Sequence, residues 1–183
     1  MAIPEPIITE RTVLESSPLD PVGLVQRGSS NFSYMRFDDI DAITASISDE
    51  FSDWGPTFEM TQDKVNLFAE ITGDHQWIHV DVERANAGPF GGPIAHGFFT
   101  LSLMASIVKL PLELEGVSNG VNYGANKLRF LAPVPIPSTL HARSRVINAE
   151  AKGTGTLLTS EATIHVVGSE KPAVLYEMLT LLM

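Results

Sequence analysis

The segment from Gly97 to Leu110 constrains the fold more than any other part of this sequence, because apolar residues occupy every side of it. They are Phe98, Phe99, Leu101, Leu103, Met104, Ala105, Ile107 and Val108. A helix without a polar stripe has to be covered on all faces, and Pro111 would end it. At roughly 1.5 Å per residue it would be about 20 Å long, which suits the core of one domain. We therefore expect a long central helix wrapped by a sheet.

Four stretches of alternating apolar and polar residues follow this segment and predict the sheet. They are Val121–Ala132, Leu140–Ile147, Leu158–Val167 and Ala173–Leu182. In the second stretch Leu140 and Ala142 alternate with His141 and Arg143, so one face is apolar and the other polar. We expect His141, and His165 in the third stretch, to lie on the polar faces as ordinary solvated residues. The predicted fold class is α+β, with a curved antiparallel sheet wrapped around the central helix.

Shorter elements are predicted upstream of the central helix. Residues 37–47 carry apolar side chains at roughly helical spacing, and residues 50–60 alternate as a strand does. Thr61 is a suitable N-cap for a helix that Gly73 would end, and residues 82–87 could form a second short helix.

Length and composition fit one domain with an added arm. A chain of 183 residues with 44% hydrophobic residues can bury one substantial core, and two full domains are not expected. Residues 1–30 contain four prolines and no sustained periodicity, so we expect an N-terminal arm at 1–30 and a single domain at 31–183. Residues 1–27 lack a basic start followed by an apolar stretch, and no apolar run could span a bilayer, so a cytoplasmic location is expected.

Charge and cysteine content exclude several classes of function. The chain has 12 basic and 22 acidic residues, a formal charge of −10, which argues against binding nucleic acid or an anionic membrane. It has no cysteine, so disulfides, zinc-thiolate sites and a cysteine nucleophile are all excluded.

An acid and an imidazole, Asp74 and His79, stand five positions apart directly after Gly73. On a helix, positions i and i+5 point about 140° apart, and on a strand they lie on opposite faces. Only a curled loop would bring the two side chains together, and Gly73 supplies the backbone freedom to leave the helix. This pair is therefore the candidate for general acid-base chemistry.

A zinc site is a weaker interpretation of the same segment. His75 and His79 are four residues apart, and His96 or Asp81 could serve as a third ligand. However, the pair follows a helix-ending glycine, and Gln76 stands where a zinc-protease motif carries glutamate. We expect no metal.

Several separated motifs together resemble a known family. They are Phe68–Ala85 with Gly73-Asp74 and Ile78-His79, Gly88-Pro89-Phe90, Ala95-His96-Gly97, and Asn122–Phe130. The chain is similar to the MaoC-like dehydratases, the R-specific enoyl-CoA hydratases of the hot-dog fold, and most similar to the branch that includes nodulation protein N. The resemblance covers about residues 33–183.

The resemblance implies a lyase that adds water to a trans-2-enoyl thioester and forms an R-3-hydroxyacyl thioester, or catalyses the reverse dehydration. Asp74 and His79 would hold one water for syn addition, and the backbone N–H of Gly97 would bind the thioester oxygen. A helix N-terminus independently suits that oxygen, because its N–H groups are unpaired and carry partial positive charge. Coenzyme A would enter only as part of an acyl-CoA substrate, with no other cofactor; an acyl carrier protein is the alternative carrier.

Further residues are candidates for binding the substrate: Gln76, Trp77, His96, Tyr123, Lys127 and Arg129. Gln76-Trp77 replaces the Asn-Pro of most hydratases, and Trp77 either lines the acyl tunnel or fills the core. His96 precedes the helix and more simply makes a structural hydrogen bond. Lys127 and Arg129 could meet the phosphates of coenzyme A, or form a solvated strand face.

Two other functions stay open. Hot-dog proteins also include acyl-CoA thioesterases, and a protein of this kind could bind acyl thioesters without catalysis.

A single curved sheet leaves an edge strand unpaired, and hot-dog relatives pair such edges, so we expect a homodimer or a dimer of dimers.

Overall fold

A computed structural model describes residues 35–183; the arm expected at 1–30 lies outside the described residues. The helices are α1 Ile40–Ala45, α2 Gln62–Thr72, α3 Trp77–Val80, α4 Val82–Asn86, α5 Gly97–Ser102 and α6 Met104–Ile107. The strands are β1 Met35–Arg36, β2 Phe58–Met60, β3 Leu114–Glu115, β4 Gly120–Phe130, β5 Ser138–Lys152, β6 Gly155–Val166 and β7 Val174–Leu182. None of the helices in 35–183 combines the length and apolar character that crossing a membrane requires.

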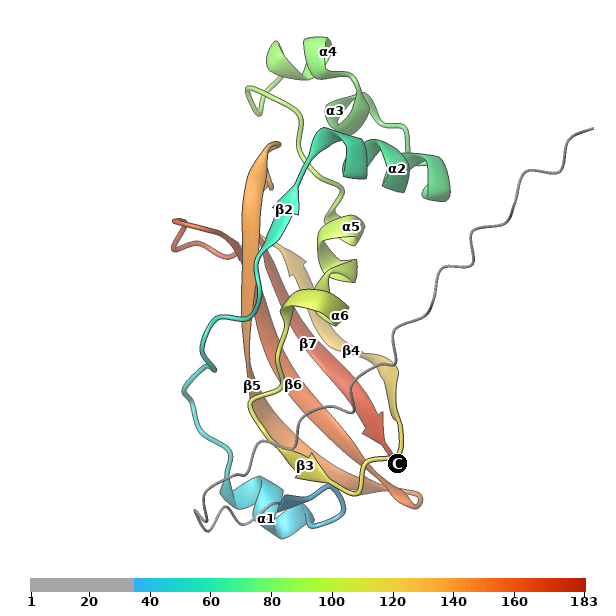
Figure 1. The fold of residues 1–183 in the computed structure, drawn as a ribbon, viewed down its shortest axis with the longest axis vertical. Helices are drawn as coiled ribbons and strands as arrows, with labels where there is room; N and C mark the ends of the chain where they lie inside the picture. Colours follow the sequence, from blue (N-terminus) through green and yellow to red (C-terminus); the bar gives the residue numbers. More distant parts are fainter. Residues whose placement is uncertain (1–34) are drawn as a thin grey trace, which may run out of the picture. The chain divides into compact units, whose positions relative to one another are not determined.

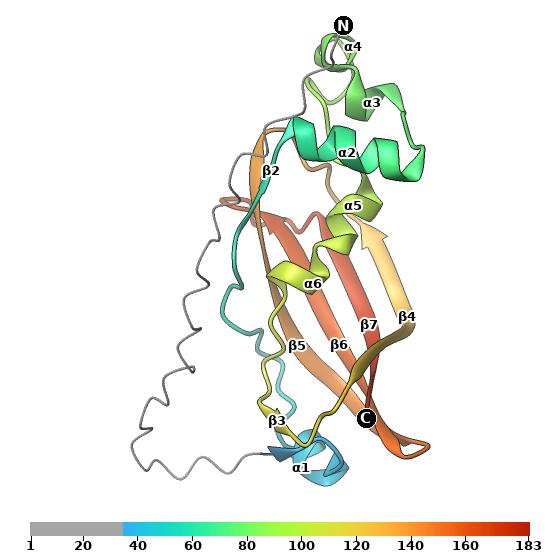
Figure 2. The same ribbon diagram turned by 45° about the vertical axis from the view of Figure 1, so that its right-hand side comes forward.

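One five-stranded antiparallel sheet forms the body of the domain, in the order β2-β5-β6-β7-β4. Figures 1 and 2 show the sheet curving around α5 and α6, with α2, α3 and α4 gathered beyond one end and α1 with β3 at the other. The short strands β1 and β3 pair in parallel, separately from this sheet. The predicted α+β plan, a curved antiparallel sheet around helical core segments, is confirmed.

The alternation predicted for β5 sets the two faces of the sheet. Leu140 and Ala142 are fully buried and pack with Ile107 and Leu103 of the helical layer. Their neighbours His141, Arg143 and Arg145 point to the opposite side, which we call the outer face. A second apolar cluster, built on Ile43 of α1, fills the far end of the sheet.

The central helix is shorter and more broken than expected. It divides at Leu103 into α5 and α6 and ends at Ile107, before Pro111 is reached. The hydroxyl of Ser102 donates to the Phe99 carbonyl at 2.7 Å, and the Leu103 N–H bonds to the Thr100 carbonyl three residues back. Such local bonds compete with the regular helical pattern, and counting apolar positions does not reveal them.

One side of this helical layer stays uncovered in the single chain. Phe98 of α5 is 66% exposed, although the sequence predicted a fully buried helix. The adjoining edge strand β4 exposes Val121, Tyr123 and Phe130 as well. We call these four residues the apolar edge.

The strand expected at residues 50–60 is also mostly irregular, with only β2 regular. At Gly55 the backbone approaches the Ile107 carbonyl oxygen so closely that a Cβ would collide with it, so only glycine fits. Pro56 then removes a ladder donor. The stretch still runs along β5, since Ser52 and Gly55 donate backbone bonds to it at 2.8 Å.

Candidate active site

Asp74 leaves α2 at the point that the sequence predicted. Thr61 is the N-cap of α2, although its side chain makes no capping bond, and Gly73 ends the helix in the left-handed conformation with φ of 76°. The Gly73 N–H closes the last turn on the Ala69 carbonyl at 2.8 Å. Asp74 therefore begins a short loop and presents an exposed carboxylate.

His79 was expected to lie in that loop, but it lies on the one-turn helix α3. Its N–H bonds to the Gln76 carbonyl at 2.9 Å, and its carbonyl accepts from the Gln62 side chain at 2.7 Å. The loop is thus only residues 73–76, and α3 turns the imidazole back toward Asp74. Spacing alone could not show this helix, because four residues are too few for a periodic signal.

The hydrogen bonds of His79 determine which ring nitrogen is free to react. Nδ1 lies 2.7 Å from the Ile94 carbonyl oxygen, which can only accept, so Nδ1 carries the hydrogen. In the neutral ring Nε2 is then an unprotonated acceptor. The backbone bond also fixes the orientation of the ring, as a general base requires.

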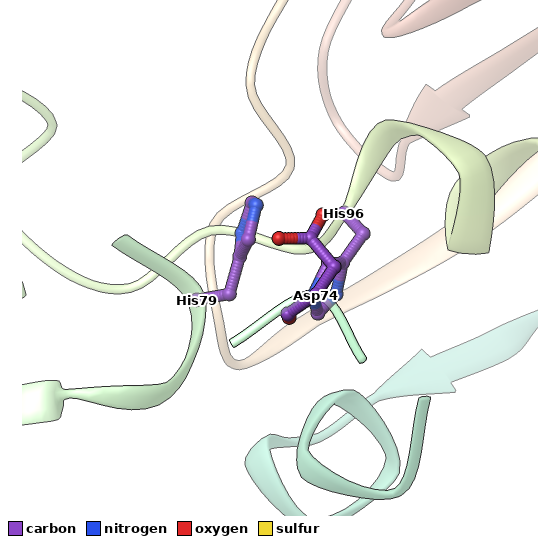
Figure 3. A group of neighbouring side chains, drawn as sticks. All are labelled: Asp74, His79 and His96. Carbon is purple, nitrogen blue, oxygen red and sulfur yellow. The ribbon is translucent and has the colours of Figure 1, made fainter. Parts of the chain in front are cut away.

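A third residue, His96, completes the cluster. Its Nε2 donates to the backbone carbonyl of Asp74 at 2.9 Å, and its ring lies against that of His79 with centroids 3.9 Å apart. Figure 3 shows the Asp74 carboxylate pointing toward the His79 ring, with His96 beside both. Polar atoms of the three side chains lie within 4.8 Å of one another, a gap that one water can bridge between Asp74 and His79.

The electrostatics of the cluster favour a neutral His79. Burial is the largest cause that lowers its pKa below 6.5, and the neighbouring His96 lowers the pKa further. The bond to the Ile94 carbonyl and the charge of Asp74 raise the pKa without offsetting the burial. The imidazole can therefore accept a proton at neutral pH.

Gly97 and an apolar cavity adjoin the cluster. Gly97 is the first residue of α5, and it lines a cavity of about 380 Å³ together with His79. The other lining residues are mostly apolar: Phe90, Ile94, Ala95, Phe98, Thr100, Phe130, Leu131, Ala132, Pro133, Val134, Ala173 and Val174. A Cβ at position 97 would lie 2.9 Å from the Phe130 ring, so only glycine fits without displacing that ring.

A metal ion does not suit the cluster well, even though this is the one group of three neighbouring potential ligand residues found among residues 35–183. The planes of the two imidazoles are only 31° apart, so their in-plane lone pairs do not converge on one ion at about 2 Å. His75, the other half of the possible zinc pair, lies 3.7 Å from Glu70 instead.

The loop residues Gln76 and Trp77 do not line the cavity. Gln76 is exposed and occupies the N-cap position of α3, where its side chain makes no capping bond. Arg84 lies over the Trp77 ring at 4.4 Å, and a Cβ on Gly88 would touch the same ring at 3.0 Å. Of the two roles expected for Trp77, the structure supports the filling of space between α3, α4 and the following loop.

The predicted substrate contacts on β4 also lie away from the cavity in the single chain. Lys127 lies 3.6 Å from Glu177 on the outer face, and Arg129 donates to its neighbour's carbonyl. Tyr123 lies under Lys152, with the ammonium 4.6 Å from its ring. Phe130 lines the cavity but was not predicted to do so; its place at the end of an alternating strand was the one available signal.

Comparison with known proteins decides the family. The family model described as "MaoC like domain" matches residues 47–167, which is more than half of the chain. This chain is a member of the MaoC-like family. The resemblance inferred from the motifs is therefore confirmed.

Curated relatives and solved structures agree with this assignment. The MaoC-like chain is 51% identical over 127 residues to 3-hydroxyacyl-thioester dehydratase Z of Mycobacterium tuberculosis, covering 69% of this chain and 82% of the relative. It is 36% identical over 135 residues to nodulation protein N of Rhizobium leguminosarum bv. viciae, covering 72% and 81%.

Two solved structures show that the fold is the hot-dog fold of this family. The monoamine oxidase regulatory protein from Archaeoglobus fulgius has a TM-score of 0.65 at 24% identity, covering 81% of this chain and 94% of that one. The R-hydratase PhaJ1 from Pseudomonas aeruginosa has a TM-score of 0.57 at 21% identity, covering 73% and 79%.

Proposed function

We propose that this MaoC-like chain is a hydro-lyase that adds water to a trans-2-enoyl thioester and forms an R-3-hydroxyacyl thioester, or runs the reverse dehydration. The observation that carries the proposal is a carboxylate beside an oriented imidazole that lines, together with a helix N-terminus, one apolar cavity. The 51% identical relative is named a 3-hydroxyacyl-thioester dehydratase, which supports the same reaction.

The chemistry follows from the position of each group. One water lies between the Asp74 carboxylate and Nε2 of His79. Its oxygen forms the bond to C3 as one O–H bond of the water breaks and that proton passes to the Asp74–His79 pair. The pair delivers a proton to C2 on the same face of the double bond. The thioester oxygen gains negative charge as C3 is attacked, and the Gly97 N–H stabilises that charge at the positive end of α5.

The cavity supplies the place for the acyl chain. Apolar walls bury the hydrocarbon and leave the reacting carbons near His79 and Gly97. Coenzyme A is the proposed carrier, with acyl carrier protein as the alternative.

The direct test follows the enoyl-thioester absorbance band with one short and one long trans-2-enoyl-CoA, and determines the configuration of the product by chiral chromatography. We expect loss of the band and formation of the R-3-hydroxyacyl product, with no free thiol. Release of free thiol would indicate a thioesterase. Binding without either change would indicate a non-catalytic acyl-thioester protein.

We also propose that two copies of this chain pair through the apolar edge, as a homodimer or as half of a dimer of dimers. Strand β4 is a sheet edge with unpaired backbone groups, and Phe98, Val121, Tyr123 and Phe130 are each between 43% and 66% exposed. A second copy would pair the edge and cover these side chains. The same contact would enclose the cavity, because Phe98 and Phe130 line it.

Light scattering tests the assembly, and we expect at least twice the 19.9 kDa of one chain. Val121→Glu should shift the mass toward the monomer, because it buries a charge in the proposed interface. Val167→Glu is the matched control, since Val167 is 48% exposed but lies outside the apolar edge. A wild-type mass of one chain at micromolar concentration would contradict the proposal.

A further inference from the structure

His96 is a buried titratable residue that the proposed mechanism does not use. It is 2% exposed, and its Nδ1 has no hydrogen-bond partner among residues 35–183. A buried polar atom without a partner costs free energy, so its retention calls for an explanation. The contacts of the rest of the ring supply one.

His96 touches both halves of the acid-base pair. Its Nε2 donates to the backbone carbonyl of Asp74 at 2.9 Å, across 22 residues of sequence. One face of the ring lies against His79, with centroids 3.9 Å apart, and Phe68 of α2 approaches it at 5.0 Å. The loop that carries Asp74 is short and exposed, and the Gln76 N–H reaches the carboxylate only at 3.4 Å.

The chain position of His96 adds a third connection. It is the N-cap residue of α5, directly before Gly97, and its own carbonyl accepts the Thr100 N–H at 3.0 Å. One rigid residue therefore joins the start of α5, the Asp74 loop and the His79 ring. A displacement of about 1 Å in such groups can lower a rate by about 10²-fold.

We infer that His96 is a positioning residue: it holds the Asp74 loop through the backbone carbonyl and supports the His79 ring by direct contact. The inference rests on the proposed hydratase function and extends it to a residue outside the reacting atoms. His96 is not among the residues that line the cavity, so its effect is expected in kcat and much less in KM.

Two amide variants at position 96 distinguish the role of Nε2, which bonds the Asp74 carbonyl, from that of Nδ1, which has no partner. Gln places an amide nitrogen near the position of Nε2 and can donate to the Asp74 carbonyl, whereas Asn reaches only the position of Nδ1, which has no partner. We expect His96→Asn and His96→Ala to lower kcat about 10- to 100-fold, and His96→Gln to stay within about fivefold of wild type. KM should change less than threefold in all three.

A second measurement reports on His79 without any substrate. Among the described residues, the titratable groups that act on the His79 ring are His96 and Asp74. Removing the His96 ring opens the site to water and removes the neighbour that lowers the pKa of His79. The pKa of His79, followed by NMR titration, should therefore rise in His96→Ala, and the low-pH limb of the kcat/KM profile should move to higher pH with it.

His165→Gln is the matched control. His165 is 3% exposed, bonds a backbone carbonyl through Nδ1 and has a free Nε2, but lies on the outer face of the sheet. It should lower the melting temperature without changing kcat or the titration of His79.

The outcomes are decisive in either direction. A loss in His96→Asn that His96→Gln repairs, together with the rise in the pKa of His79, supports the inference. Equal kcat in the Gln and Asn variants overturns the role of the Asp74 bond, and an unmoved His79 titration overturns the support of His79. If wild type hydrates no enoyl thioester, the proposed function fails, while the NMR titration still tests His96.

Discussion

The domain contains two pairs of neighbouring histidines, and they lie on opposite sides of the sheet. His79 and His96 adjoin the cavity at the start of α5, with rings 3.9 Å apart. His141 and His165 face each other across β5 and β6 on the outer face, with rings 6.3 Å apart. Burial is the largest cause that lowers the pKa of His79, His141 and His165 alike.

The groups around each pair make the difference. Asp74 places a carboxylate beside His79, and Gly97 adds a helix N-terminus next to an apolar cavity. On the outer face, Trp54 stacks on His141 at 3.7 Å, and the charge of Arg143 lowers the pKa of both histidines. A lowered histidine pKa is therefore not a catalytic signal by itself; what sets the cavity side apart is the neighbouring carboxylate and the helix N-terminus beside an apolar cavity.

The largest predicted effect is a loss of activity that follows changes in the cavity-side cluster but not changes in the outer-face histidines. Asp74→Asn and His79→Ala should each lower hydratase kcat by about 10²- to 10⁴-fold, because in the proposed mechanism both groups hold the same water. His141→Gln and His165→Gln should leave kcat within about twofold. Steady-state kinetics of the four variants, with melting curves to confirm folding, check this. Near wild-type turnover in either site variant would refute the assignment.

The next largest effect is expected from a change at Gly97, whose backbone N–H is the proposed oxyanion donor on the cavity side. Gly97→Val should lower kcat by about 10²-fold, because its side chain would block the approach of the thioester oxygen to the backbone N–H, an effect comparable to the loss of one oxyanion donor. The Phe130 ring complicates this variant, since it occupies the space a Cβ would need. Adding Phe130→Ala relieves that clash, and we expect kcat to stay low in the double variant.

Recovery of kcat in the double variant would show that Gly97 matters only for packing against Phe130. Gly92→Ala provides the control for an added methyl group, because its Cβ would meet nothing closer than Asn86 at 3.7 Å. It should be neutral in both kcat and melting temperature.

The sequence predicted the parts of this comparison that depend on local patterns. Gly73 was predicted as a helix end because glycine favours that position, and the two faces of β5 were predicted from the alternation of apolar and polar residues. The resemblance also pointed to Asp74, His79 and Gly97, which the fold brings to one place, while their catalytic roles stay predictions.

The parts that were missed depend on contacts between distant segments. The break at Leu103 comes from hydroxyl-to-carbonyl bonds, and the bond from His96 to Asp74 joins residues 22 positions apart. His165 was expected to be solvated because it lies on a polar strand face, but Trp54 from an irregular stretch helps to cover it. No periodicity in one strand reveals what another segment places above it.

The smallest predicted effect is one that the two pairs share, a loss of stability in acid. Since the folded-state pKa values of His79, His141 and His165 lie below 6.5, the unfolded chain binds more protons than the folded one once the pH falls below about 6.5. Their contribution to the free energy of unfolding is therefore complete above pH 6.5 and is lost as the pH falls through the lowered folded-state values. Urea unfolding at pH 8, 6.5 and 5.5 measures this slope. We expect His165→Gln to flatten this slope by removing one of the three groups, while lowering stability at pH 8. An unchanged slope would show that His165 does not take part, and would leave His79 and His141 as the histidines that link stability to pH.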